Sequence, residues 1–136
     1  MYLCFQRPEI TAMYCRSLTL VVVVASLSLP VLGQEKSGAE VYDAVCSECH
    51  GTGKLNAPRL GDRKRWGKLV REGLDDLVPA AMRGVRKMPA MGGNPQLDDL
   101  EVARAVVFMA NAGGGKFAEP TAADAARWRK KAGARK

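Results

Sequence analysis

The pentapeptide CSECH, residues 46 to 50, restricts the fold more than any other part of this sequence. It contains the only histidine of the chain, His50, and two of its four cysteines. The two cysteines are three residues apart, so a helix would present both thiols on one face. Residues 38–49 are predicted to form that helix, because apolar positions recur every three or four residues. These positions are Tyr42, Val45, Cys46 and Cys49.

A C-x-x-C pair occurs in three kinds of site. C-x-x-C-H is typical of covalent haem attachment, in which two thiols form thioethers with the porphyrin vinyl groups and the histidine ligates the iron. A zinc site requires four ligands and CSECH has three, so zinc would need a carboxylate as well. A redox pair belongs at a helix N-terminus, whose dipole lowers the thiol pKa, whereas this pair ends its helix and flanks Glu48. Haem attachment is favoured, with the zinc site and a structural or redox C-x-x-C module as alternatives.

The N-terminal part contains an apolar run, LTLVVVVASLSL, at residues 18–29, preceded by Arg16 and followed by Pro30. The run fits the apolar part of a secretory signal and is short for a membrane helix, which needs about 20 residues. We interpret residues 1–33 as a signal peptide, with Met13 as an alternative start, and this predicts export to the periplasm. An uncleaved signal would anchor the protein to the membrane, and a buried strand is a further alternative.

Removal of the signal leaves a domain at residues 34–112 and a Gly linker with a basic C-terminal tail at residues 113–136. Of the formal net charge of +7, the tail carries +5, because it has seven basic and two acidic residues. The domain itself is nearly neutral, which argues against nucleic acid as a partner. We interpret the tail as a flexible solubilising extension, in which Thr121 and Asp124 could cap one short helix. Contact of the tail with an anionic membrane or an acidic partner is the alternative.

The domain is predicted to be all-α. After the first helix, Asp62 caps a second that ends at Glu72, a third covers residues 75–83, and Asp98 with Glu101 forms the capping box of a fourth. The aromatic residues of the domain are only Tyr42, Trp66 and Phe108. A domain this small, with so little apolar mass, needs a staple, a metal or a cofactor. We therefore expect a large apolar group at its centre.

Several segments together resemble the class I c-type cytochromes. GAEVYDAVCSECH is similar to the N-terminal helix of that family, with Gly38 and Tyr42 in the places of its glycine and aromatic residue. NAPRLGD resembles the loop after the haem histidine, and Trp66, MPAMGG and VVFMANAGGG look most like the cytochrome c5 branch. The resemblance covers residues 38–114 and implies a small cytochrome c fold of three to five helices around one haem c. Cofactor binding would then involve Cys46 and Cys49, which hold the haem covalently, and His50, which ligates its iron.

Two further residues are candidates for cofactor binding. By the resemblance, the carbonyl of Pro58 accepts the Nδ1 proton of His50, which fixes the tautomer and orientation of the imidazole. The indole N–H of Trp66 could bond a haem propionate, or the ring could simply pack. Trp66 lies in a basic segment, residues 54–71, with seven cationic residues against Asp62. That segment is either a rim that steers an acidic redox partner or a solvated helix face.

The second axial ligand of the iron has four candidates in the exported chain. A methionine thioether is the usual partner of histidine in electron-transfer cytochromes. Met82 and Met109 fall within predicted helices and are more simply core residues. Met88 and Met91 lie in the irregular loop KMPAMGGNPQ, which is free to bring a side chain over the haem. By the resemblance Met88 matches the ligand of the family, with Met91, or no methionine at all, as the alternatives.

This ligand set predicts a function. Iron with both axial positions filled by His50 and Met88 has no vacant position for a substrate, so we expect an electron carrier and not an enzyme. Such a monohaem cytochrome would pass single electrons by outer-sphere transfer between a donor and an acceptor, including a membrane complex. The alternative is a haem-based sensor or binding module for small ligands, with a labile sixth ligand.

Overall fold

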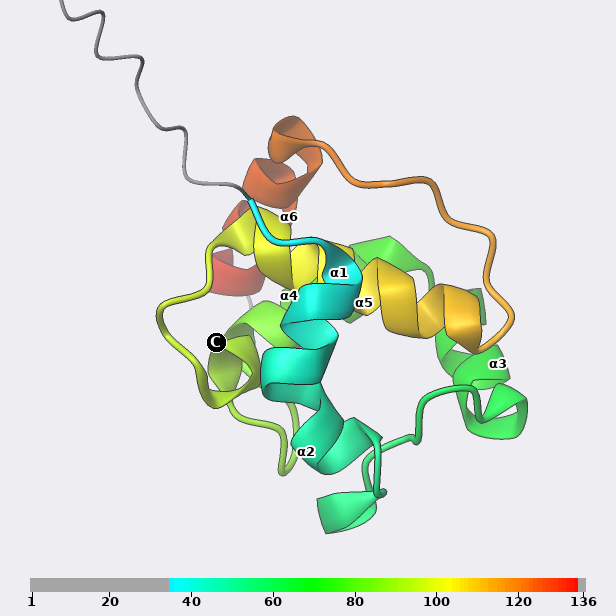
Figure 1. The fold of residues 1–136 in the computed structure, drawn as a ribbon. Helices are drawn as coiled ribbons and strands as arrows, with labels where there is room; N and C mark the ends of the chain where they lie inside the picture. The colour runs from blue at the N-terminus through cyan, green and yellow to red at the C-terminus, as the bar shows by residue number, and fades with distance from the viewer. Residues whose placement is uncertain (1–34, 135–136) are drawn as a thin grey trace, which may run out of the picture. The chain divides into compact units, whose positions relative to one another are not determined.

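The computed structural model describes residues 35 to 134, so the predicted signal peptide lies outside the described residues. In Figure 1 this part of the chain consists of helices: α1 Gly38–Val41, α2 Ser47–His50, α3 Arg63–Glu72, α4 Leu74–Arg83, α5 Asp99–Ala112 and α6 Ala122–Ala134. Between residues 35 and 134 there is no strand, only an isolated bridge between Val85 and Met88. None of the helices in this range is long and apolar enough to cross a membrane. The expected all-α fold class is confirmed.

The helix that carries CSECH is present and contains one turn of π-helix. α1 begins at a capping box, in which the Ser37 hydroxyl accepts from the Glu40 amide at 3.2 Å. The π-helix η1, Tyr42–Cys46, joins α1 to α2 without a break. A π-turn inserts one residue into the helical repeat, and Val41 and Tyr42 are consecutive yet both buried. The regular apolar spacing did not predict this turn, which rotates CSECH relative to the start of the helix.

α1 crosses α5 at close range (Figure 1). A Cβ atom on Gly38 would lie 2.3 Å from the carbonyl oxygen of Arg104, so glycine is required for this approach. Beside the crossing, the rings of Tyr42 and Phe108 pack with their centroids 5.5 Å apart. The glycine and the aromatic residue that precede CSECH therefore seat its helix on α5.

The other predicted helices of the domain are also present, with the predicted caps. The Asp62 carboxylate accepts from the amides of Lys64 and Arg65 at the start of α3. Asp98 and Glu101 form the capping box of α5. The apolar face expected for α5 is buried and consists of Val102, Ala105, Val106 and Met109. Because a cap joins residues two or three apart, these helix starts were visible in the sequence.

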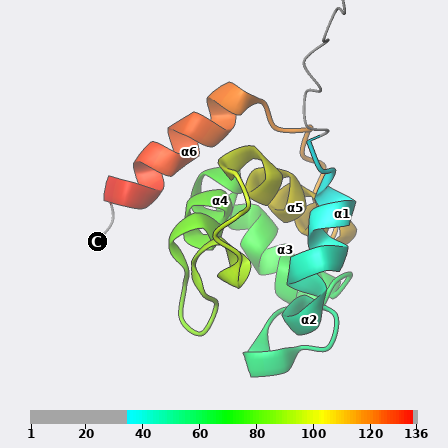
Figure 2. The same cartoon turned by 60° about the vertical axis from the view of Figure 1, so that its left-hand side comes forward.

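The C-terminal segment is not the flexible extension that the sequence led us to expect. Residues 122–134 form α6, which packs against α4 and α5 (Figure 2). Thr121 and Asp124 make the expected capping box. The face of α6 toward the domain consists of Ala125, Trp128 and Ala132, all buried, with Trp128 only 3% exposed. The expectation was wrong because one large aromatic residue between two alanines, at helical spacing, is enough to dock an otherwise basic helix.

Candidate functional site

His50, the last residue of α2, is buried and oriented by the loop that follows it. Its Nδ1 lies 2.8 Å from the carbonyl oxygen of Pro58, which is the contact implied by the resemblance. Because a carbonyl oxygen can only accept, Nδ1 carries the proton and Nε2 keeps its lone pair. The backbone carbonyl of His50 also accepts from the amide of Leu60 at 2.7 Å. The loop thus holds the imidazole in the tautomer that leaves Nε2 available to a metal ion.

Trp66 supports the same loop from α3. It is 4% exposed, and its ring centroid lies 6.1 Å from that of His50. The indole Nε1 donates to the carbonyl of Arg59 at 2.8 Å. The indole N–H is therefore already bonded within the protein, which agrees with the alternative that the ring simply packs. A contact between Trp66 and a cofactor stays a prediction.

Two basic residues of segment 54–71 also brace this loop. Arg65 donates to the carbonyl of Asn56 at 2.7 Å, and Arg59 donates to the carbonyl of Gly51 at 3.3 Å. The side chains that point to solvent are those of Arg63, Lys64, Lys68 and Arg71, all of them exposed. Part of the basic segment is thus structural, and the exposed part is a solvated face of α3.

The two thiols of CSECH are not joined to each other. Cys46 and Cys49 are both half-buried free cysteines. Burial raises the pKa of the Cys46 thiol to about 11, and the neighbouring Cys49 adds to the rise. Cys46 is therefore protonated at neutral pH, unlike the activated thiolate of a redox C-x-x-C pair.

The four methionines of the described chain fall into two groups. Met82 and Met109 are 1% and 2% exposed, within α4 and α5, as expected for core residues. Met88 and Met91 are half-buried in the loop between α4 and α5. Gly84 ends α4 with φ of 85°, and Val85 and Met88 then exchange backbone hydrogen bonds of 3.0 and 2.9 Å. We call residues 84–94 the methionine loop.

An apolar cavity connects the CSECH helix to the methionine loop. Its wall on α5 is formed by Val102, Ala105, Val106 and Met109, and Cys46, Met88 and Met91 also line it. No charged side chain lines the cavity. The cavity itself is narrow, but the chemistry of its apolar lining, with a thiol and thioethers, suits the faces of a porphyrin, whose iron takes imidazole and thioether ligands. The residues present therefore fit a haem group.

Arg83, which the sequence reasoning overlooked, is a further residue that would hold a carboxylate of the same group. It ends α4 directly before the methionine loop. Within residues 35–134, its Nη1 is the buried side-chain nitrogen or oxygen that has no hydrogen-bond partner. A buried guanidinium N–H without an acceptor is costly, and a carboxylate is its natural partner. The sequence feature that could have identified Arg83 is its position as a cationic residue at the end of a predicted helix, five positions before Met88.

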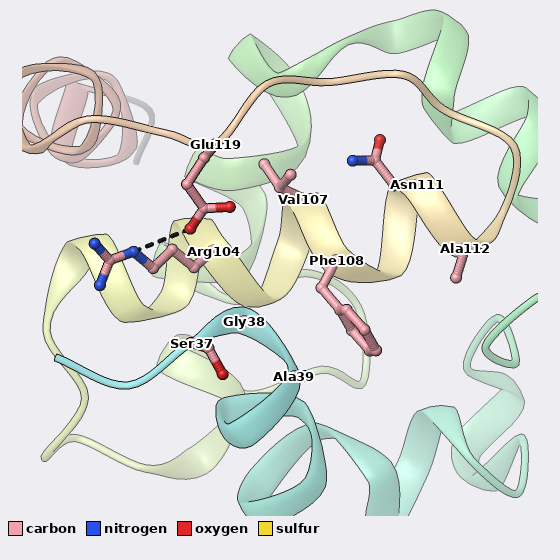
Figure 3. Close-up of a pocket in the computed structure, with 9 residues that line it drawn as sticks. All are labelled: Ser37, Gly38, Ala39, Arg104, Val107, Phe108, Asn111, Ala112 and Glu119. Atoms are coloured by element: carbon pink, nitrogen blue, oxygen red, sulfur yellow. Dashed lines mark ion pairs between the residues drawn. The ribbon is translucent and has the colours of Figure 1, made fainter.

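The remaining candidates for a site offer less chemistry. In the described part of the chain, no group of three or more His, Cys, Asp or Glu side chains could hold a metal ion, so the zinc alternative has no ligand set there. A hollow at the α1–α5 crossing is lined by Ser37, Phe108 and Arg104 (Figure 3). Arg104 is neutralised there by Glu119 at 3.1 Å and Glu35 at 2.9 Å. Neither thiol nor imidazole faces this hollow, which leaves the CSECH cavity as the candidate site.

Comparison with known proteins agrees with this site. The family model described as cytochrome c oxidase, cbb3-type, subunit III matches residues 33–109. Cytochrome c-555 of Chlorobaculum thiosulfatiphilum is 39% identical over 77 residues, covering 54% of this chain and 90% of that protein. Cytochrome c5 of Azotobacter vinelandii is 37% identical over 76 residues, covering 54% and 92%. A chain from the crystal structure of an electron transfer complex of nitrite reductase with cytochrome c matches with a TM-score of 0.54, at 34% identity, and covers 56% of this chain and 93% of that one.

An all-α fold that places a C-x-x-C-H motif beside an apolar cavity is typical of a c-type cytochrome. The chain belongs to the cytochrome c family that the matching model and these relatives represent, the class I monohaem cytochromes. Its cofactor is haem c, bound covalently through Cys46 and Cys49, and it is an electron carrier and not an enzyme. The resemblance found in the sequence is confirmed. The family match ends at residue 109, so α6 lies beyond it.

Proposed function

We propose that this cytochrome carries single electrons with an iron ligated by His50 and Met88. When bound, haem c supplies the one-electron couple between ferric and ferrous iron. The observation that carries the proposal is the 2.8 Å contact between His50 Nδ1 and the Pro58 carbonyl, which leaves Nε2 free. Met88 would supply the second ligand, and it supports the proposal because it is a half-buried thioether that lines the same cavity as Cys46.

The residues around the cavity have distinct tasks in this proposal. The Pro58 carbonyl keeps the His50 ring in one orientation, so little rearrangement accompanies a change of charge. The apolar wall of α5 excludes water, and a thioether ligand favours the reduced state and so raises the reduction potential. Arg83 offers its buried Nη1 to a haem carboxylate, which offsets the charge of that group.

The ligand assignment is tested by comparing Met88→Ala with Met91→Ala. The wild-type protein should show the thioether-to-iron charge-transfer band when oxidised and should not bind carbon monoxide when reduced at neutral pH. Met88→Ala should lose the band and bind carbon monoxide, because its sixth position is open. Met91→Ala is the matched control and should keep the band. A band that survives in Met88→Ala would overturn the assignment, and carbon monoxide binding by the wild type would favour the sensor alternative.

We also propose that the redox partners dock at the end of the domain that contains η2, Lys54–Asn56, and the methionine loop. Both segments lie at the same end in Figures 1 and 2. Leu55 and Val85 are the exposed large hydrophobic residues of the described chain, at 53% and 42%, and the exposed Arg86 and Lys87 follow Val85 directly in sequence. Exposed apolar side chains with cations beside them suit a partner with an acidic rim. One related chain comes from a complex with nitrite reductase, so an enzyme or membrane complex is the expected class of partner.

Location in the periplasm follows from the predicted signal peptide and is part of the same proposal. N-terminal sequencing of the protein from an exporting host should begin at Gln34. A mature protein that begins at Met1 or Met13 would instead favour a retained membrane anchor.

A further inference from the structure

α6 is an addition to the family pattern that reaches the methionine loop. It lies beyond the matched residues 33–109 and is anchored by contacts that do not involve that loop. The buried Trp128 provides the anchor, and its indole donates to Asp75 at 2.6 Å. The ion pair of Arg127 with the same carboxylate is exposed and adds little to it. α6 is therefore held in place on α4, so its other side chains occupy defined positions relative to the domain.

Arg129 joins α6 to both α5 and the methionine loop. Its Nε donates to the two carboxylate oxygens of Asp99, at 2.9 Å each, and its Nη2 also bonds Asp99. The same Nη2 donates to Sδ of Met91 at 3.0 Å. Asp99 opens α5, so the planar guanidinium is aligned by a two-pronged ion pair before it reaches the sulfur.

The methionine loop needs such support because its backbone is strained next to Met88. Met91 has a φ of 55°, in the left-handed region, and Gly92 and Gly93 follow with φ of 65° and 88°. A non-glycine residue in that region costs free energy unless its surroundings hold it. Pro89 and Ala90 alone separate Met91 from Met88, so movement of one methionine is transmitted to the other.

We propose that Arg129 is a positioning residue that ties the methionine loop to α5 and α6 through Met91, and thereby keeps Met88 on the iron. The inference rests on the proposed ligation by Met88. In this arrangement Met91 is not a ligand, because its sulfur accepts from Arg129, and the C-terminal helix beyond the family match sets how easily the sixth position opens.

The test uses the holoprotein with Arg129→Leu, Met91→Leu and the double variant. Arg127→Leu is the matched control, since Arg127 lies on the same helix and pairs with Asp75 and Asp124 instead. Carbon monoxide can bind the reduced iron only when the sixth ligand leaves, so its binding rate measures that opening. We expect each single variant to bind roughly tenfold faster than wild type, as for loss of a hydrogen bond from a charged donor. The double variant should be no faster than the singles, and Arg127→Leu should match wild type.

Amide hydrogen exchange over residues 88–94 provides a readout that does not depend on which residue ligates the iron. Exchange there should rise in Arg129→Leu and Met91→Leu and not in Arg127→Leu. Met91→Leu leaves the Arg129–Asp99 pair intact, so it tests the contribution of the Arg129–Met91 contact even if Arg129→Leu disturbs α6. Unchanged exchange and rates in Met91→Leu, or additive effects in the double variant, would overturn the inference. Failure of the ligand assignment itself is recognised separately, by the spectrum of Met88→Ala.

Discussion

The histidine and methionine sides of the site are built in different ways. On the histidine side the hydrogen bonds are short in sequence: Pro58 is 8 residues from His50, and Arg59 is 7 residues from Trp66. On the methionine side the local contact is the Val85–Met88 bridge, and the next support, Arg129, is 38 residues from Met91. The hydrogen bonds that orient His50 should therefore tolerate changes in α6, whereas the methionine side should respond to them.

The largest effect is expected from Cys46→Ala combined with Cys49→Ala, which removes the covalent attachment that both sides share. Without its haem the small domain lacks much of its core, so most of the helical circular-dichroism signal should disappear. Ser47→Ala is the control within the same helix and should keep both haem and fold. A native-like helical spectrum in the haem-free double variant would show that the domain is stable without the cofactor.

The close packing of the CSECH helix against α5 can be disrupted without a change on either the histidine side or the methionine side. Gly38→Ala places a Cβ atom 2.3 Å from the Arg104 carbonyl, and we expect it to lower the free energy of unfolding by about 1–3 kcal/mol, as overpacking does. Gly67→Ala in α3 is the matched control, because the nearest atom to its added Cβ is a flexible Arg71 nitrogen at 3.9 Å. That variant should be neutral or more stable by up to about 1 kcal/mol. Chemical denaturation measures both, and equal effects would argue against a close α1–α5 crossing in solution.

The proposed contact of Arg83 with a haem carboxylate is tested through the reduction potential of Arg83→Gln. Oxidation adds a positive charge to the iron, so a nearby cation favours the reduced state and its loss should lower the potential. A fall of about 60 mV corresponds to a tenfold change in the equilibrium of a one-electron couple. Arg86→Gln removes an exposed cation from the adjoining methionine loop and should have a smaller effect. Equal potentials in wild type and Arg83→Gln would contradict a bond between Arg83 and a haem carboxylate.

The smallest effect concerns the docking of α6 at low pH. The pKa of Asp75 is held below its usual range, first by the hydrogen bond from Trp128 and also by the charge of Arg127. Since the folded-state pKa is lowered, the stabilisation is complete above about pH 4, the usual value for an aspartate, and is lost as pH falls through the lower folded value.

Wild type and Trp128→Phe should therefore differ in how much stability they lose between pH 6 and pH 3. The wild type should lose more, by less than about 1 kcal/mol because the carboxylate is largely exposed. Chemical denaturation at the two pH values gives this difference. Asp75→Asn should remove the same contribution, and an identical pH response in all three proteins would mean that this contact does not stabilise α6.

Features that depend on nearby residues were predictable from the sequence. Asp62 and Asp98 cap helices through amides two or three positions away, and the apolar repeat of α5 identifies its buried face. The His50–Pro58 contact was expected from the resemblance and is present. The π-turn at Tyr42–Cys46 was not predicted, because one inserted residue alters the helical repeat without a distinct residue type to mark it.

Features that depend on distant residues were missed or misjudged. The prediction of a flexible tail was wrong because Trp128 stabilises α6 by packing against α4 and α5. The sequence of the tail alone does not reveal that surface. The indole of Trp66 was considered as a hydrogen-bond donor to a haem propionate, yet its N–H donates to the backbone carbonyl of Arg59 in the folded loop. Arg83 was overlooked because its isolation from other hydrogen-bonding groups exists only after α4 has packed.

The sequence by itself determined the chemistry of this protein: two thiols and an imidazole at fixed spacing, helices with their caps, and too few aromatic residues for an independent core. These properties are set by the covalent order of the chain and by interactions within one or two helical turns. Only the tertiary structure decided that Met88 and Met91 line a cavity together with Cys46, that Arg83 has a buried nitrogen without a partner, and that α6 contacts the methionine loop. These features depend on how distant segments pack, as Arg129 and Met91 do across 38 residues.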